Sequence, residues 1–94
     1  MDKSTFTANA IKRNGVASYI QEERHIFGRN LRRARKKTGL TQKDVERITG
    51  VTQAFLSNIE KGKTNSSLDT MVILSKGLSV PIWKLFLPFD AQDN

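Results

Sequence analysis

The dipeptide Thr-Gln occurs twice in this chain, eleven residues apart, beginning at Thr41 and at Thr52. Each copy precedes a short run of apolar residues with helical spacing. Thr41 also stands three residues before Asp44, the pattern of a capping box, in which two side chains bond the backbone N–H groups at a helix start. Gly50 lies between the two runs and readily adopts the left-handed backbone of a tight turn. The chain is therefore predicted to contain two short helices, each capped by threonine and joined by a tight turn.

The glutamine of each pair is then the first residue of its helix, beside backbone N–H groups that carry a partial positive charge. Two helix starts directed at one anionic surface would explain the repetition. The alternative is that threonine is simply a good cap and that glutamine is tolerated in a first turn.

Periodicity predicts three further helices. One carries Phe27, Leu31 and Ala34, another begins at Ser66 or Ser67, and the last opens at Pro81. Residues 16–26 predict a short extra helix or a forward extension of the next one. We expect an all-α chain of five short helices, with a flexible N-terminal arm at 1–25, a compact domain at 26–88 and a tail at 89–94. The expected core comprises Leu40, Val45, Val51, Leu56, Ile59, Leu68, Met71, Leu74, Leu78, Val80, Ile82 and Leu85.

Positive charge is concentrated in the middle of the chain. Between residues 29 and 63 there are ten Lys or Arg and three acidic residues, whereas six bases and six acids lie outside that window. The whole formal charge of +7 therefore falls on the segment with the two threonine-capped helices. This segregation favours a polyanionic partner over a merely solvated basic face.

Several classes of site are unsupported by the composition. The 94 residues include no cysteine, which excludes disulfides and thiolate metal ligands, and His25 is the one histidine, in a polar stretch typical of a solvated residue. We expect no enzyme, no metal, no cofactor and no small-molecule ligand. No apolar stretch approaches the roughly 18 residues of a membrane span, and the start lacks a signal peptide, so a cytoplasmic protein is expected.

Four motifs together resemble the phage lambda-repressor-like helix-turn-helix family of Xre/Cro type, over about residues 26–87. They are Gly39-Leu40-Thr41-Gln42, Gly50-Val51-Thr52, Leu56-Ser57-x-Ile59-Glu60-x-Gly62 and Ser67-Leu68-x-Thr70. The resemblance implies that a recognition helix at about residues 53–61 lies in the DNA major groove. Two departures are Glu46, where the family has a small residue, and the pair Gly77 and Ser79, where it often has Ala and Gly.

The resemblance also implies roles for individual residues. The expected base contacts are Gln53, Ala54, Ser57 and Asn58, whose chemistry suits adenine edges and thymine methyl groups; the alternative for Gln53 and Asn58 is ordinary surface polarity. The expected phosphate contacts are Gln42, Lys43, Lys61, Lys63, Thr64 and Asn65. Arg35 and Glu60 match a pair that bridges the first helix to the recognition helix.

Trp83, Leu87 and Phe89 supply more apolar surface than one small core needs, which predicts a homodimer contact. The alternative for Trp83 is packing at the core edge or on the N-terminal helix. The leading hypothesis is a transcriptional regulator, a repressor or autoregulator, that binds an inverted repeat of double-stranded DNA as a homodimer. The alternative is an antitoxin-like protein-interaction module with a reduced DNA role.

Overall fold

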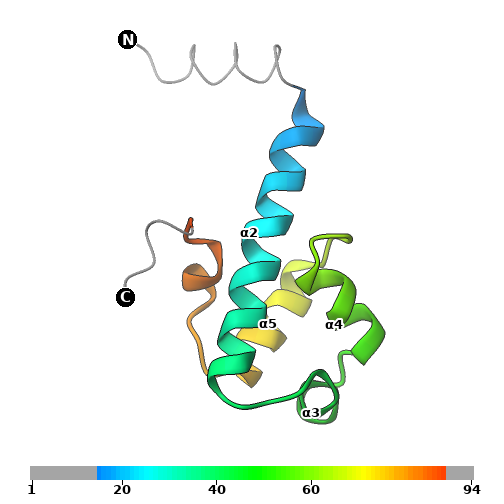
Figure 1. Ribbon diagram of the computed structural model, residues 1–94, viewed down its shortest axis with the longest axis vertical. Coiled ribbons are helices and arrows are strands. Elements are labelled where there is room, and N and C mark those ends of the chain that lie inside the picture. Colours follow the sequence, from blue (N-terminus) through cyan, green and yellow to red (C-terminus); the bar gives the residue numbers. More distant parts are fainter. Residues whose placement is uncertain (1–14, 89–94) are drawn as a thin grey trace.

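The computed structural model describes residues 15–88, which form an all-α domain (Figure 1). These residues contain four α helices, not the five expected, and a 3-10 helix takes the place of the last. The elements are α2 (Val16–Lys37), α3 (Gln42–Thr49), α4 (Gln53–Glu60), α5 (Leu68–Gly77) and η1 (Ile82–Phe86). None of the helices in this part of the chain is both long enough and apolar enough to cross a membrane.

Both threonine caps are present as predicted. The Thr41 N–H donates to Asp44 Oδ2 at 2.9 Å, and the Asp44 N–H donates to Thr41 Oγ1 at 3.0 Å, which completes the capping box of α3. The Thr52 hydroxyl accepts from the Phe55 N–H at 3.2 Å and caps α4. Gly50 ends α3 with a φ of 81°, a left-handed conformation, so the turn between α3 and α4 forms where the sequence indicated.

The first helix includes the segment for which the sequence allowed either a separate helix or an extension. α2 runs without a break for 22 residues, so residues 16–26 are a forward extension of the helix that carries Phe27 and Leu31. Its N-terminal half projects beyond the other helices (Figure 1). The helix is continuous across the boundary expected at residue 26, and the division into arm, domain and tail stays a prediction. Residues 1–14 and 89–94, including Phe89, lie outside the described residues.

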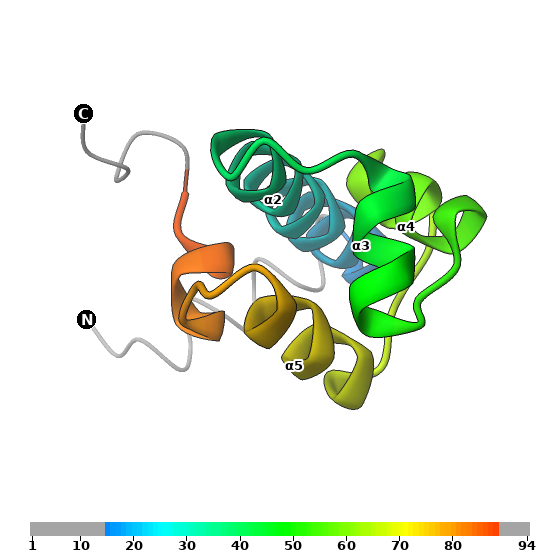
Figure 2. The same ribbon diagram turned by 90° about the horizontal axis from the view of Figure 1, so that it is seen from below.

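The core lies where α2, α4, α5 and η1 meet, with α3 closing one side (Figure 2). Its buried apolar side chains are Phe27, Leu31, Val45, Leu56, Ile59, Leu74, Leu78 and Leu85. Two residues expected in the core lie outside it: Leu68 is 64% exposed, and Ile82 is partly buried and does not pack against the buried cluster. Leu68 is the first residue of α5, and the inward-facing side of that helix begins one turn later, at Met71.

The last element is a short 3-10 helix that α2 holds in place. Asn30 is buried, and its Nδ2 donates to the carbonyl oxygens of Leu85 at 3.0 Å and Leu87 at 2.9 Å. These bonds satisfy carbonyl groups at the end of η1 that have no helical partner. Pro81 has an extended ψ of 138° and precedes the helix instead of forming its first turn. Only five residues separate it from Leu87, which has an extended backbone, and short segments of this kind commonly form 3-10 helices.

Gly77 and Ser79, which depart from the family pattern at the end of α5, have opposite structural consequences. A Cβ atom at Gly77 would lie 2.5 Å from Thr49 Cγ2, so glycine permits the close packing of α5 on α3. Ser79 has a φ of 55°, the left-handed conformation that glycine adopts most easily. Gly77 therefore serves the packing, whereas Ser79 occupies a strained position that a glycine would relieve.

Candidate nucleic-acid interface

Helix α4 packs against α2 with almost no space between their backbones. A Cβ atom at Gly28 would lie 2.3 Å from the carbonyl oxygen of Ile59 and 2.8 Å from that of Glu60. Gly28 is therefore the residue that allows the last turn of α4 to reach α2, and any side chain there would push the helices apart. Sequence reasoning missed Gly28; the signal available was a glycine inside a strongly helical pattern, which often marks a close approach.

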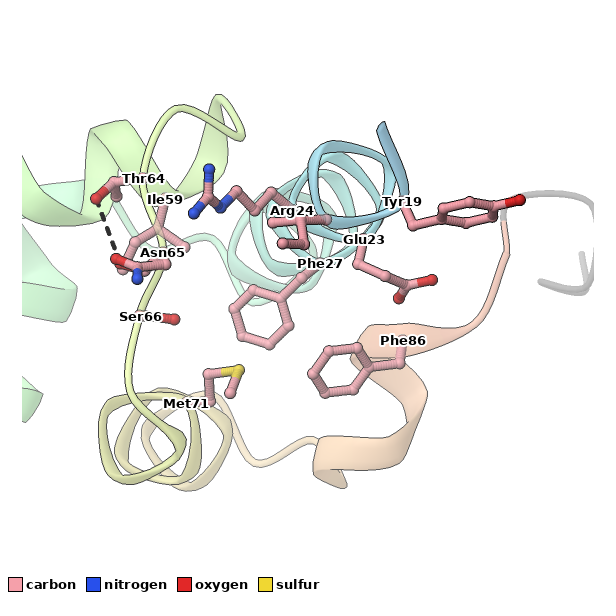
Figure 3. Close-up of a pocket in the computed structure, with 11 residues that line it drawn as sticks. Tyr19, Glu23, Arg24, Phe27, Ile59, Thr64, Asn65, Ser66, Met71 and Phe86 are labelled. Carbon is pink, nitrogen blue, oxygen red and sulfur yellow. Dashed lines mark hydrogen bonds between the residues drawn. The ribbon is translucent and has the colours of Figure 1, made fainter. Parts of the chain in front are cut away.

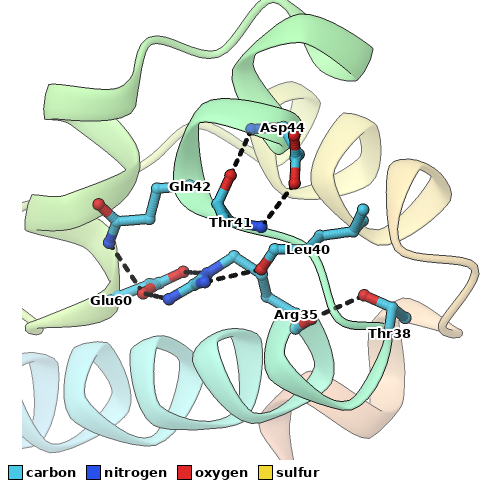
Figure 4. A network of polar contacts seen from close by, with 7 residues as sticks. All are labelled: Arg35, Thr38, Leu40, Thr41, Gln42, Asp44 and Glu60. Atoms are coloured by element: carbon cyan, nitrogen blue, oxygen red, sulfur yellow. Dashed lines mark hydrogen bonds and ion pairs between the residues drawn. The ribbon is translucent and has the colours of Figure 1, made fainter.

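A buried ion pair joins the same two helices (Figure 4). Arg35 Nε donates to Glu60 Oε2 at 2.7 Å and Arg35 Nη2 donates to Glu60 Oε1 at 3.0 Å, so the pair is bidentate. The two side chains are 10% and 3% exposed. Hydrogen bonding to Glu60 raises the pKa of the Arg35 guanidinium above its ordinary value, against an opposing effect of burial. The Arg35 guanidinium thus remains charged, and the bidentate contact fixes the end of α4 against α2.

The ion pair extends to the start of α3. Arg35 Nη1 donates to the Leu40 carbonyl oxygen at 2.9 Å, and Gln42 Nε2 donates to Glu60 Oε1 at 3.1 Å. Figure 4 shows Glu60 between the Gln42 amide and the Arg35 guanidinium. One carboxylate therefore links α2, α3 and α4. The sequence reading had not connected Gln42 with this pair.

The first turns of α4 expose the side chains expected to contact bases. Gln53, Ala54 and Asn58 are exposed, and Ser57 is partly buried. Their spacing of three and four residues places them on one face of the helix. Within the described part of the chain, the side chains of Gln53, Ser57 and Asn58 have no hydrogen-bond partner. This face presents amide and hydroxyl groups to solvent on a helix whose other face is buried through Leu56 and Ile59.

The residues expected to contact phosphate flank that face. Lys61, Lys63 and Asn65 are exposed in the segment that follows α4. Thr64 is partly buried, and its hydroxyl donates to the Asn65 carbonyl oxygen at 3.3 Å. Lys43 lies in the first turn of α3 with its side chain 70% exposed.

Glu46, the unusual residue of α3, is partly buried, with its side chain 31% exposed, and its carboxylate forms an ion pair with Lys43 at 3.3 Å. The roles of all these residues toward DNA stay predictions.

The segment after α4 also contacts the N-terminal half of α2. Gln21 Nε2 donates to the Gly62 carbonyl oxygen at 3.1 Å and lies 2.9 Å from His25 Nε2. A Cβ atom at Gly62 would lie 2.6 Å from His25 Nδ1, so glycine makes room for the imidazole ring. His25 therefore packs on the turn that carries Lys61 and Lys63, a contact that its polar sequence surroundings did not reveal.

The residues expected at a dimer contact differ in exposure. Trp83 is 60% exposed, and Lys84 Nζ lies 5.7 Å from the centroid of its ring. Leu87 is partly buried beside α2. Trp83 therefore does not close the core edge. Among residues 15–88, no three His, Cys, Asp or Glu side chains cluster as metal ligands would.

Several known proteins are similar to this chain in sequence and in fold. A helix-turn-helix family profile matches residues 31–82. An uncharacterized HTH-type transcriptional regulator of Sinorhizobium fredii is 37% identical over 67 residues, which cover 71% of this chain and 87% of the relative. The control protein C.SmaI of Serratia marcescens is 29% identical over 62 residues, 66% of this chain and 74% of that protein. The crystal structure of the restriction-modification controller protein C.AhdI from Aeromonas hydrophila matches with a TM-score of 0.66 and 28% identity, over 69% of this chain and 98% of that one.

Proposed function

The chain belongs to the Xre-type helix-turn-helix family of DNA-binding transcriptional regulators, and from this premise we propose that it acts as a homodimeric repressor of an inverted-repeat operator. In this proposal α4 is the recognition helix and enters the major groove. The relatives are named as regulators and control proteins, a class without enzymatic activity.

The exposed face of α4 is the observation that carries the proposal. Gln53 and Asn58 can each donate to and accept from an adenine edge, Ser57 can do either, and Ala54 can contact a thymine methyl group. These polar side chains have no hydrogen-bond partner within residues 15–88, so they exchange bonds with water for bonds with a base and break no intramolecular bond. The buried Arg35–Glu60 pair and the close approach at Gly28 hold the helix that presents them, so its backbone is preorganised for binding.

Phosphate contacts would supply most of the affinity. The helix starts at Gln42 and Gln53 both have N–H groups without helical partners, which suit a phosphate oxygen. Lys43, Lys61 and Lys63 add positive charge on either side of α4. Since the Gln42 side chain is bonded to Glu60, a phosphate bound there would be coupled to the buried ion pair.

A homodimer would set the arrangement of the half-sites. A two-fold related pair of α4 helices reads two half-sites about 34 Å apart, one turn of DNA. Trp83, which is 60% exposed, supports such a contact, and Leu87 and Phe89 follow it in the sequence.

The test is in vitro selection from a random duplex library at about 0.15 M salt, where phosphate contacts alone give weak, sequence-independent binding. Wild type is compared with the double variant Gln53→Ala, Asn58→Ala and with Lys76→Ala, an exposed substitution on α5 that serves as control. We expect wild type and the control to enrich the same inverted repeat and the double variant to enrich none. Enrichment of the same site by the double variant would show that α4 does not read the bases. A wild type that enriches nothing but retains a protein partner on purification would favour the antitoxin-like alternative.

A further inference from the structure

The turn that follows the recognition helix is held partly by α4 itself. The Gly62 N–H donates to the Ile59 carbonyl oxygen at 3.0 Å. The Lys63 N–H donates to the Asn58 carbonyl oxygen at 2.9 Å, and Gly62 has a left-handed φ of 71°, which together form a Schellman motif. This motif uses the Gly62 N–H but leaves the Gly62 carbonyl oxygen for a partner outside α4.

Helix α2 supplies that partner. Gln21 Nε2 donates to the Gly62 carbonyl oxygen at 3.1 Å and lies 2.9 Å from His25 Nε2. Because a carbonyl oxygen only accepts, the amide nitrogen of Gln21 must face Gly62, and His25 Nε2 must then accept from the same nitrogen. The His25 ring also packs on Gly62, where a Cβ atom would lie 2.6 Å from Nδ1. His25 therefore fixes the Gln21 amide, and Gln21 fixes the turn.

A groove of about 470 Å³ lies between α2 and the residues that follow this turn (Figure 3). Phe27 and Phe86 line it, with ring centroids 5.1 Å apart. Figure 3 shows the Arg24 side chain extending from α2 toward Thr64, and the Arg24 Nε is buried. Because open space separates α2 from residues 64–66 in the groove, α2 holds the segment after α4 mainly through its contacts near Gly62.

The turn carries positive charge on both sides of the residue that α2 holds. Lys61 and Lys63 are exposed, whereas Gly62 between them is buried. If the backbone of the turn were free to move, it would have to be ordered when a phosphate binds, at a cost in conformational entropy. Fixing the backbone between the two lysines removes part of that cost before DNA arrives.

We propose that Gln21 and His25 are positioning residues for DNA binding, which hold the Gly62 turn so that Lys61 and Lys63 meet the phosphates with their backbone already in place. This inference rests on the DNA contacts of the proposed function. It adds the first half of α2, which lies outside the helix-turn-helix profile match at residues 31–82, to the parts of the chain that determine DNA affinity.

The test is fluorescence anisotropy of the full chain with a random-sequence duplex at about 0.05 M salt, where phosphate contacts alone give measurable affinity. Gln21→Met removes the amide with little change in size. Ala17→Met, at an exposed position one helical turn earlier, is the control. We expect Gln21→Met to bind about fivefold more weakly, the factor that one hydrogen bond contributes, and the control to stay within about twofold of wild type. Equal affinities of Gln21→Met and wild type would overturn the proposal.

A second measurement separates positioning from a direct contact of Gln21 with DNA. In a chain that also carries Lys61→Ala and Lys63→Ala, Gln21→Met should have no further effect, because neither lysine remains to be placed. An effect of Gln21→Met that persists undiminished in that background would show that Gln21 does not act through the lysines.

Amide hydrogen exchange without DNA separates positioning from a general loss of stability. Exchange at the Lys63 N–H should be about fivefold faster in Gln21→Met than in wild type, because the turn opens locally. Exchange at Leu74, which is buried on α5, should be unchanged. Equal acceleration at both amides would mean that the substitution only destabilises the domain, and it would overturn the proposal.

These outcomes are distinguishable from a failure of the proposed function, because phosphates occur in every duplex and the anisotropy test needs no sequence reading. A wild type that selects no inverted repeat, but loses affinity for the random duplex on Gln21→Met, would sink the repressor proposal and leave this one standing. A wild type that selects a repeat and is indifferent to Gln21→Met would do the reverse. A wild type that binds no duplex would overturn both.

Discussion

Removing the Glu60 carboxylate should be among the most destabilising single substitutions in this domain. In Glu60→Ala, the Arg35 guanidinium loses the partners of its Nε and Nη2 atoms and keeps only the bond from Nη1 to the Leu40 carbonyl oxygen. The Gln42 amide loses its bond as well. A charged group with a side chain only 10% exposed is then left without a counter-ion.

Removing one member of a buried ion pair costs about 3–5 kcal/mol, because the other charge remains desolvated. We expect about 3 kcal/mol here, the lower end, since the Arg35 side chain keeps some contact with water. In a domain of this size, that free energy corresponds to a fall in Tm of about 12–24 °C. Lys43→Ala, which breaks the surface pair with Glu46, should cost less than about 1 kcal/mol.

The assay is urea unfolding followed by circular dichroism, with Arg35→Met, Glu60→Leu as a second variant. Replacing both charges with apolar groups removes the desolvation cost, so the double variant should recover most of the lost stability. A Glu60→Ala protein within about 1 kcal/mol of wild type, the range of an exposed pair, would refute the reasoning. The folded double variant also allows a separate measurement of DNA affinity, and we expect that affinity to fall because Gln42 and α4 lose their shared anchor.

Three further predictions follow from the described contacts. Lys63→Ala should weaken binding to all DNA sequences and reduce the slope of log K against log salt by about 0.9, as measured by fluorescence anisotropy. If Lys63 contacted a base instead, the substitution would change the sequence specificity and leave that slope unaltered. Gly28→Ala should destabilise the domain and lower its DNA affinity, because the added Cβ would lie 2.3 Å from the Ile59 carbonyl oxygen. Gly39→Ala is the control, since no atom lies within 4 Å of its added Cβ. It should reduce stability through the φ of +78° at that position and leave the DNA affinity per folded molecule unchanged. Hydrogen bonds from Thr41, of which the bond from its backbone N–H has the largest effect, lower the pKa of Asp44 below its ordinary value of 3.8. The ionised Asp44 carboxylate therefore stabilises the folded state above pH 3.8, and this stabilisation is lost as the pH falls through the lower folded-state pKa. Asp44→Asn should therefore differ from wild type in thermal unfolding at pH 6 and converge with it below pH 3.8; a constant difference would contradict the capping role.

The local features of the fold were predictable because they depend on neighbouring residues. The two threonine caps, the turn at Gly50 and the buried stripe of Phe27 and Leu31 follow from spacing alone, and all are present. The position of the last helix was not predictable, because the hydrogen bonds that hold its end come from Asn30, 55 and 57 residues away in the chain.

The residue types of the candidate site were predictable from the sequence, but the contacts that hold those residues in place were not. The Arg35–Glu60 pair was expected from family resemblance, whereas the bond from Gln42 to Glu60 and the contact of His25 with Gly62 depend on how α2, α3 and α4 meet. Likewise, the groove beside Phe86 exists because residues 16–26 continue α2 as one helix. The sequence left open whether that segment was a separate helix, so the groove could not be foreseen.

The close approach at Gly28 has a consequence for how such a chain diversifies. The atoms that hold α4 lie at its C-terminal end, at Ile59 and Glu60, while the side chains proposed to read bases lie at its start and on its outer face. Exchanging residues at 53, 54, 57 and 58 would then retarget the protein to a different operator without repacking the scaffold. Mutational drift at the reading positions would be tolerated, and a duplicated copy of the chain could acquire a new operator in a few steps.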